Sequence, residues 1–228
     1  MTARHLIEVR DLTFGYEGRP LLFDGAALAI HEDDQIGLWA DNGTGKTTLL
    51  RILSGLAKPR TMTLTLDGRT ITDEEGFRSV RRHFGFVLQN PDDQLFFPEV
   101  LDDVMFGPLN LGLSYEKARE AAFAALAELG ISDLANAESF RLSGGQKRLV
   151  SLACVLSMQP DGLFLDEPTA GLDKGARERL THVLQGLGGP RLCVSHSMDF
   201  LRAVSNRLVT IRDGHIAALD FDGSGHFG

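Results

Sequence analysis

Residues 40–47 combine a lysine, two threonines and two glycines at the spacing of a phosphate-binding loop (P-loop). The stretch reads ADNGTGKT, and the usual pattern G-x-x-x-x-G-K-[ST] would place glycine where Ala40 stands. The backbone N–H groups of such a loop and of the helix that follows converge on one point, which suits a polyphosphate. Lys46 would reach the β- and γ-phosphates, and the Thr47 hydroxyl would ligate Mg²⁺. The other loop residues expected at the nucleotide are Asn42, Gly43, Thr44, Gly45 and Thr48.

Alanine at the first loop position weakens the site only if that position has a positive φ. In that case Ala40 would cost ~1–2 kcal/mol, which is roughly tenfold in affinity. With a negative φ the cost is close to zero. In either case we expect the loop still to bind ATP.

Two adjacent carboxylates follow an apolar run in GLFLDEPT (162–169). An acid at the C-terminal end of a buried strand lies where the ligands of parallel sheets bind. Asp166 would hold Mg²⁺, directly or through water, and Glu167 would polarise the attacking water. The alternative is that these acids only cap the next turn. A lysine-bearing loop elsewhere in the same sheet favours the first interpretation.

The stretch RLSGGQKR (141–148) predicts a second anion-binding helix start, opened by Ser143, Gly144 and Gly145. The chain has one P-loop, so this second element has no phosphate site of its own. A site completed by another subunit would account for it.

Hydrophobic periodicity predicts the elements that position these residues. Strands are expected at 5–16, 21–30 and 34–40, and a helix from Lys46 to about 55. A short strand follows at 84–89, and the next stretch contains three prolines and begins a second lobe. Later elements are a helix after Ser114, a helix over about 144–158, buried strands at 162–168 and 191–196, a helix around 200–204 and a hairpin turning at Asp213-Gly214.

Composition excludes several classes of protein. The chain has 228 residues, 43% of them hydrophobic, and a net charge of −8, which argues against a nucleic-acid partner. No apolar run approaches the ~20 residues of a membrane helix, so a cytoplasmic location is expected. Cys154 and Cys193 are expected to be buried and reduced. Arg78, Arg81 and Arg82 are expected on a solvated helix face.

The order of the P-loop, LSGGQ, LFLDEPTAGLD and VSH resembles the nucleotide-binding subunit of an ABC transporter, from about Ile7 to Leu219. The resemblance implies an α/β fold with a RecA-like P-loop core, an antiparallel β subdomain and an inserted helical subdomain. In this single domain (1–228) the core lobe would be about 1–90 and 160–220, the helical lobe about 91–159 and a short tail 220–228. The resemblance also implies two subunits that sandwich two ATP molecules head to tail. The residues that would contact ATP on the partner's P-loop are Ser143, Gly144, Gly145 and Gln146.

Four further roles follow from the same resemblance. Tyr16 would stack on adenine, and Gln89 would act in catalysis as the link between Mg²⁺, which it would help to bind, and the membrane partner. Asp173 would lie at the dimer interface, and His196 would act in catalysis at the γ-phosphate. Tyr16 could instead be an ordinary strand aromatic, and His196 alone could be a hydrogen-bonded histidine at a strand end.

A narrower resemblance, to the ATPase component of energy-coupling factor importers, rests on VLQNPDDQLFFPEVLDDVMFGPLNLGLS (87–114) and the segment from LSGGQ to GLD. It implies uptake of cobalt, nickel or a vitamin at the inner face of the membrane. The implied partners are a second ATPase, identical or paralogous, a transmembrane T component and a substrate-capture component. An arginine of the T component would need a carboxylate, for which Asp92 and Asp93 are candidates; a solvated turn is the alternative.

Two other functions remain open on sequence grounds. A chromosome-maintenance or repair ATPase would carry a long coiled coil between the P-loop and LSGGQ, and no sustained heptad occurs there. A regulatory subunit would hold nucleotide with little turnover, yet Lys46, Asp166, Glu167 and His196 are all present. The sequence therefore favours an ATP-hydrolysing transport subunit.

Overall fold

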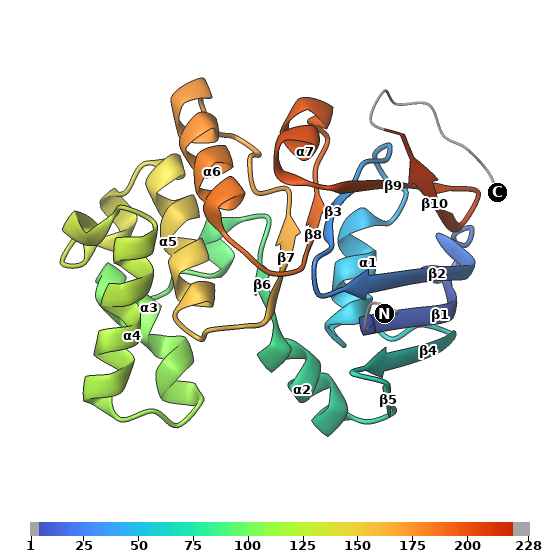
Figure 1. Ribbon diagram of the computed structural model, residues 1–228, viewed down its shortest axis with the longest axis horizontal. Coiled ribbons are helices and arrows are strands. Elements are labelled where there is room, and N and C mark those ends of the chain that lie inside the picture. Colours follow the sequence, from blue (N-terminus) through green and yellow to red (C-terminus); the bar gives the residue numbers. More distant parts are fainter. Residues whose placement is uncertain (1–4, 221–228) are drawn as a thin grey trace.

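The computed structural model describes residues 5–220, and within that range ten strands form two sheets packed with helices (Figure 1). The predicted α/β class, a P-loop core with an antiparallel β subdomain and added helices, is confirmed. Beyond residue 220, the predicted tail lies outside the described residues.

The larger sheet has six strands in the order β10-β9-β3-β8-β7-β6. All neighbours are parallel except β9 and β10, which form the predicted hairpin around Asp213-Gly214. Strands β7 and β8 are buried at every residue, as their unbroken apolar runs predict. The strands are β3 (Gln35–Leu38), β6 (Phe84–Val87), β7 (Gly162–Asp166), β8 (Arg191–Val194), β9 (Arg207–Arg212) and β10 (His215–Leu219).

The smaller sheet is antiparallel, in the order β2-β1-β4-β5. Two of its strands, β4 and β5, were not predicted from the sequence. Buried side chains of this sheet cluster with those of helix α1, which follows the P-loop. The strands are β1 (His5–Phe14), β2 (Phe23–His31), β4 (Thr61–Leu66) and β5 (Arg69–Ile71).

Helices α3, α4 and α5 group together at one end of the molecule, on the left of Figure 1. The predicted arginine-bearing helix face lies on α2, where Arg81 pairs with Glu74. The helices are α1 (Lys46–Leu53), α2 (Glu74–His83), α3 (Val100–Asn110), α4 (Tyr115–Glu128), α5 (Gly144–Leu156), α6 (Lys174–Gly186) and α7 (Met198–Val204), with short 3₁₀ turns at Pro91–Asp93, Ser132–Leu134 and Ser139–Arg141.

Helix α3 forms within the proline-containing stretch, in which no helix was predicted. Pro108 has no N–H to donate to the carbonyl of Val104, four residues earlier in the helix. The Ser157 hydroxyl lies 2.8 Å from that carbonyl oxygen and donates to it instead. A side chain from the end of α5 therefore replaces the helical hydrogen bond that the proline removes.

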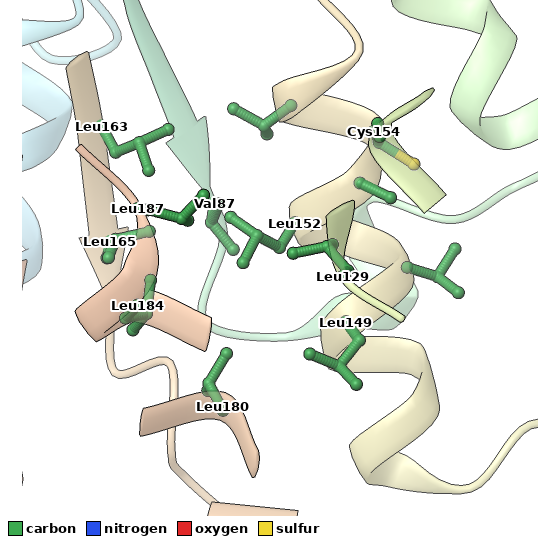
Figure 2. Close-up of a cluster of buried hydrophobic side chains, with 14 of the residues drawn as sticks. Val87, Leu129, Leu149, Leu152, Cys154, Leu163, Leu165, Leu180, Leu184 and Leu187 are labelled. Carbon is green, nitrogen blue, oxygen red and sulfur yellow. The ribbon is translucent and has the colours of Figure 1, made fainter. Parts of the chain in front are cut away.

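In the part of the chain that the structure describes, two clusters of buried side chains form the core. In the first, Leu149 and Leu152 of α5 gather with Val87 of β6 and with Leu180 and Leu184 of α6 (Figure 2). This cluster runs from the helices onto the strands, so the helical group is packed directly against the larger sheet; the lobe boundaries themselves stay a prediction. Cys154 and Cys193 are free and buried, as predicted.

Arg191, in an apolar run of the sequence, is a buried arginine on β8. Its guanidinium donates to the carbonyls of Val204 and Leu187 and to the side-chain oxygen of Gln35, at 2.7–3.1 Å. Burial lowers the pKa of Arg191. These bonds anchor the C-terminal ends of α6 and α7 beside β8, the strand that leads to His196.

No helix within residues 5–220 combines the length and the apolarity needed to cross a membrane.

Candidate functional site

Four neighbouring strands of the larger sheet end at one edge, and site residues follow each of them. The P-loop follows β3, Ser195 and His196 follow β8, Glu167 follows β7, and Gln89 lies two residues beyond β6. Cross-strand register is level, because Val194 lies opposite both Leu38 and Asp166. The prediction that these strands extend to residues 40, 168, 196 and 89 is wrong by two residues each, since the chain leaves the sheet to form the site.

The backbone at position 40 does not require a glycine. Within the P-loop, positive φ is confined to Gly43 (80°) and Gly45 (104°), and Ala40 is buried. Gly45 is needed for its backbone conformation, and a Cβ there would also lie close to the Phe23 ring, at 3.0 Å. Alanine at position 40 therefore costs close to zero in the free energy of nucleotide binding.

Lys46 is a buried lysine held by the loop that precedes it. Its ammonium donates to the carbonyl oxygens of Ala40 at 2.7 Å and Asp41 at 3.0 Å, and lies 3.5 Å from Nδ1 of His196. Only 7% of the residue is exposed. Burial lowers the pKa of Lys46, and the nearby carboxylate of Glu167 opposes that shift. An anion in the loop would stabilise the charged form of this side chain.

Asp166 and Thr47 meet across the sheet edge. The Thr47 hydroxyl donates to Asp166 Oδ1 at 2.9 Å, and Asp166 is 2% exposed. Burial raises the pKa of the Asp166 carboxyl, while the hydrogen bond from Thr47 lowers it. A hydroxyl and a carboxylate oxygen are hard donors of the kind that Mg²⁺ prefers, so the pair fits the predicted magnesium site.

Glu167 sits on a strained backbone and carries an incompletely satisfied carboxylate. Its φ is +46°, which non-glycine residues seldom adopt. The backbone N–H of His196 donates to Oε2 at 3.2 Å; Oε1, 3.2 Å from His196 Nε2, is buried without a hydrogen bond. Strain and unsatisfied polar atoms of this kind concentrate at functional sites.

These elements surround an open cavity of about 560 Å³, here called the P-loop cavity. Tyr16, half exposed, lies on its rim and shares a hydrogen bond of 3.2 Å with Thr48. Of the residues predicted at the nucleotide, those that line the cavity are Tyr16, Asn42, Gly43, Gly45, Lys46, Thr47, Thr48, Gln89, Glu167 and His196.

Two predicted residues lie just outside this lining, and four lining residues were missed. Thr44 closes the loop by donating to the Asp41 carbonyl at 2.9 Å, and Asp166 lies behind Thr47. The lining residues that were not predicted are Arg19, Pro20, Leu21 and Leu22. The signal for them was the glycine- and proline-containing turn that follows Tyr16, since turn residues at a site edge often contact ligand.

The signature residues, Ser143, Gly144, Gly145 and Gln146, do not line the P-loop cavity. Ser143 caps α5, and Gln146 completes a capping box by accepting from the Ser143 N–H at 2.8 Å. A Cβ on Gly145 would lie 2.8 Å from the Cβ of Ala176, so this glycine allows α5 to approach α6. Asp173 caps α6 by accepting from the Ala176 N–H at 2.8 Å. The geometry therefore leaves a second helix start separate from the chain's own P-loop.

Replacing Asp166 with asparagine should stabilise the chain and abolish magnesium-dependent hydrolysis. An ionised carboxylate whose pKa is raised by burial destabilises the folded state at neutral pH. Without nucleotide, the melting temperature should rise by a few degrees, since about 1 kcal/mol moves it by about 2–4 °C at this chain length. Asp102→Asn, at an exposed position, is the matched control. An unchanged or lower melting temperature for Asp166→Asn would contradict this account.

The sequence matches the ABC transporter family over residues 23–170. A relative in Nitratidesulfovibrio vulgaris is 46% identical over 215 residues, covering 93% of this chain and 78% of its own length, and its name goes no further than ABC transporter ATP-binding protein. The energy-coupling factor transporter ATP-binding protein EcfA of Methanosphaera stadtmanae is 37% identical over 215 residues, or 92% of this chain and 77% of that protein.

Solved structures give the same result for the fold. CbiO1 of Clostridium perfringens, part of the ABC transporter complex CbiONQ, superposes with a TM-score of 0.84 at 30% identity, covering 93% of this chain and 87% of CbiO1. The dimeric structure of MJ0796, a bacterial ABC transporter cassette, gives a TM-score of 0.80 at 26% identity, with coverage of 92% and 96%. Similarity in both sequence and structure thus extends over nearly the whole chain.

Proposed function

This chain belongs to the ABC transporter family and is an ATPase, and we propose that it is the motor subunit of an energy-coupling factor importer. In this proposal it works at the inner face of the cell membrane with a second ABC ATPase subunit, identical or paralogous. A T component and a substrate-capture component complete the importer, which takes up a micronutrient, a transition metal ion or a vitamin. The similarity to EcfA and to CbiO1 supports this choice.

One observation carries the proposal: a single loop joins the P-loop cavity to an exposed aromatic surface. Gln89 lines the cavity, and seven residues further on Phe96 is 63% exposed. The rings of Phe96, Phe97 and Phe106 pack against one another with centroids 5.5–6.1 Å apart. Exposed apolar clusters mark interaction sites, so an event at the nucleotide can be passed to a protein docked on these rings.

The residues of the P-loop cavity divide the work of ATP hydrolysis in this proposal. Lys46 and the loop N–H groups hold the phosphates, and Tyr16 stacks on the adenine. Thr47 and Asp166, with Gln89, hold Mg²⁺, which when bound neutralises charge on the phosphate oxygens. Glu167 orients and polarises the attacking water through its free Oε1, and His196 donates a hydrogen bond at the γ-phosphate.

The signature residues are proposed to act on the partner subunit's nucleotide. A helix start that carries capping groups but lies away from its own P-loop suits an anion supplied by a second chain. In a head-to-tail pair, each α5 would complete the other subunit's site. Asp173, at the start of α6, is then proposed to lie at the dimer interface. The dimeric structure of MJ0796 supports the pairing of two such chains.

Asp93 is the better acceptor for an arginine of the T component. Asp92 already pairs with Lys147 at 2.6 Å, whereas Asp93 makes no ion pair within residues 5–220. Both carboxylates lie in the turn before the exposed phenylalanines. An arginine that becomes buried on docking needs a carboxylate without another partner.

Asp93→Asn should therefore reduce copurification with the coexpressed membrane components much more than Asp92→Asn does. Removing one partner of a desolvated charge pair costs about 2–5 kcal/mol, at least about 30-fold in affinity. The test is pull-down of the membrane components with each variant, and ATP binding should be unchanged in both. Equal recovery with both variants and the parent would contradict docking at Asp93 and count against the importer assignment.

A further inference from the structure

The backbone beside Gln89 is held by helix α5. Strand β6 ends at Val87, so the polar groups of Leu88 lie beyond the sheet. The Leu88 N–H donates to Gln94 Oε1 at 3.1 Å, and the Leu88 carbonyl accepts from Arg148 Nη1 at 2.9 Å. Gln94 in turn donates from Nε2 to the Ser151 carbonyl at 2.8 Å. Arg148 and Ser151 lie on α5, three residues apart and on the same face.

Arg148 is an unusual residue for this position. It is 3% exposed, it forms no ion pair with any residue of the described chain, and its Nε is buried without a hydrogen bond. Burial lowers the pKa of its guanidinium, and the charge of the Asp166 carboxylate opposes that shift from beyond ion-pair distance. A buried arginine without a carboxylate in direct contact is costly, and an apolar side chain of similar length would pack there at less cost. Stability alone therefore does not explain why the Leu88 carbonyl is held by an arginine.

The same helix begins at the signature residues. Arg148 lies about one turn, or about 6 Å, from the start of α5, and the buried side chains of α5 pack against β6, β7 and α6. A helix moves as a rigid body over such a distance. Any displacement of its first turn therefore reaches Leu88 and, through the next peptide unit, Gln89 in the P-loop cavity.

We propose that Arg148 and Gln94 are positioning residues that couple the two nucleotide sites of the dimer. The inference rests on the proposed function, because it takes the start of α5 to contact the partner's ATP. When that contact forms, α5 shifts. The hydrogen bonds that Arg148 and Gln94 make to Leu88 then move Gln89 in the chain's own cavity. Binding of one ATP thereby changes how the other site responds, and the two sites hydrolyse ATP cooperatively.

The test compares Arg148→Met and Gln94→Met with the parent chain. The dependence of hydrolysis rate on ATP concentration gives a Hill coefficient, which for two coupled sites lies between 1 and about 2. Both variants should bring this coefficient to about 1 and lower kcat about fivefold or more, since couplings between sites are typically about 5–150-fold. ATP affinity of the monomer and the melting temperature should stay close to the parent values. Arg119→Met, at an exposed arginine of α4, is the matched control and should behave as the parent does.

A double variant makes the test sharper. If both residues act through Leu88, combining the substitutions should add little to the effect of either one. Parental cooperativity in both single variants would overturn the inference. Loss of monomer ATP binding together with a lower melting temperature in both variants would overturn it as well, because it would show that the two residues have a structural role. A parent Hill coefficient of about 1 would overturn it too. Failure of the proposed function is separate: it would show in the pull-down, as no recovery of the membrane components with the parent chain.

Discussion

The Glu167→Gln chain is expected to hydrolyse ATP at least about 100-fold more slowly than the parent while still binding it, because a positioned general base contributes about 10²–10⁴-fold. Glutamine keeps the shape of the side chain and can still accept from the His196 N–H, the contact that Glu167 makes at 3.2 Å. It cannot take a proton from water. Phosphate release at saturating ATP and Mg²⁺ measures the loss. Glu75→Gln, at an exposed glutamate of α2, is the matched control.

The same variant should pair with itself when ATP is present. Blocked hydrolysis keeps ATP in both cavities, so the contacts proposed for the signature residues persist. Light scattering on a sizing column should show a monomer without ATP and a dimer with ATP and Mg²⁺. A monomer that has bound ATP would indicate that a different subunit is the partner. A hydrolysis rate equal to that of the parent would refute the role of Glu167.

The grouping of the site residues was predictable because they lie in short segments at the ends of apolar strands. Parallel strands place their C-terminal ends on one edge, so Lys46, Glu167 and His196 had to meet once the strands were identified. The structure brings them together: Lys46 Nζ lies 3.5 Å from His196 Nδ1, and His196 Nε2 lies 3.2 Å from Glu167 Oε1. Local sequence was sufficient here because each residue is positioned by its own strand.

Features that depend on distant partners could not be predicted. Helix α3 continues through Pro108 because Ser157, 53 positions from Val104, satisfies the free carbonyl. The strained backbone of Glu167 depends on the bond from its N–H to the carbonyl of Val194. In both cases one residue's conformation is fixed by a group on another element, which no periodicity or local propensity records.

The hydrogen bonds that Arg148 and Gln94 make to Leu88 show that prediction of function from sequence has the same limit. The stretch RLSGGQKR indicated an anion-binding helix start, yet nothing in it indicated that Arg148 reaches back to the residue before Gln89, 60 positions away. Gln94 has an equally ordinary sequence context. The contacts that would join two sites are thus made by residues to which the recognised segments assign no role, whereas the assigned residues mark the groups at each site.

Lys46→Met should weaken ATP binding about 10- to 150-fold, which corresponds to the ~1.5–3 kcal/mol of a hydrogen bond to a charged group. Lys46 is the one ammonium among the residues that line the P-loop cavity, and it lies beneath the loop that would hold the phosphates. Methionine preserves the length and the packing of the buried stem. Titration with ATP and Mg²⁺ by calorimetry measures the change.

Ala40→Gly is the informative control for that titration, because it restores the usual first residue of the loop. Positive φ in the loop is confined to Gly43 and Gly45, so glycine at position 40 relieves no strain, and affinity should stay within about twofold of the parent. Tighter binding by about tenfold would show instead that alanine impairs the loop. Parental affinity for Ala40→Gly together with the loss in Lys46→Met would establish that nucleotide binding in this loop depends on the lysine and is indifferent to the missing glycine.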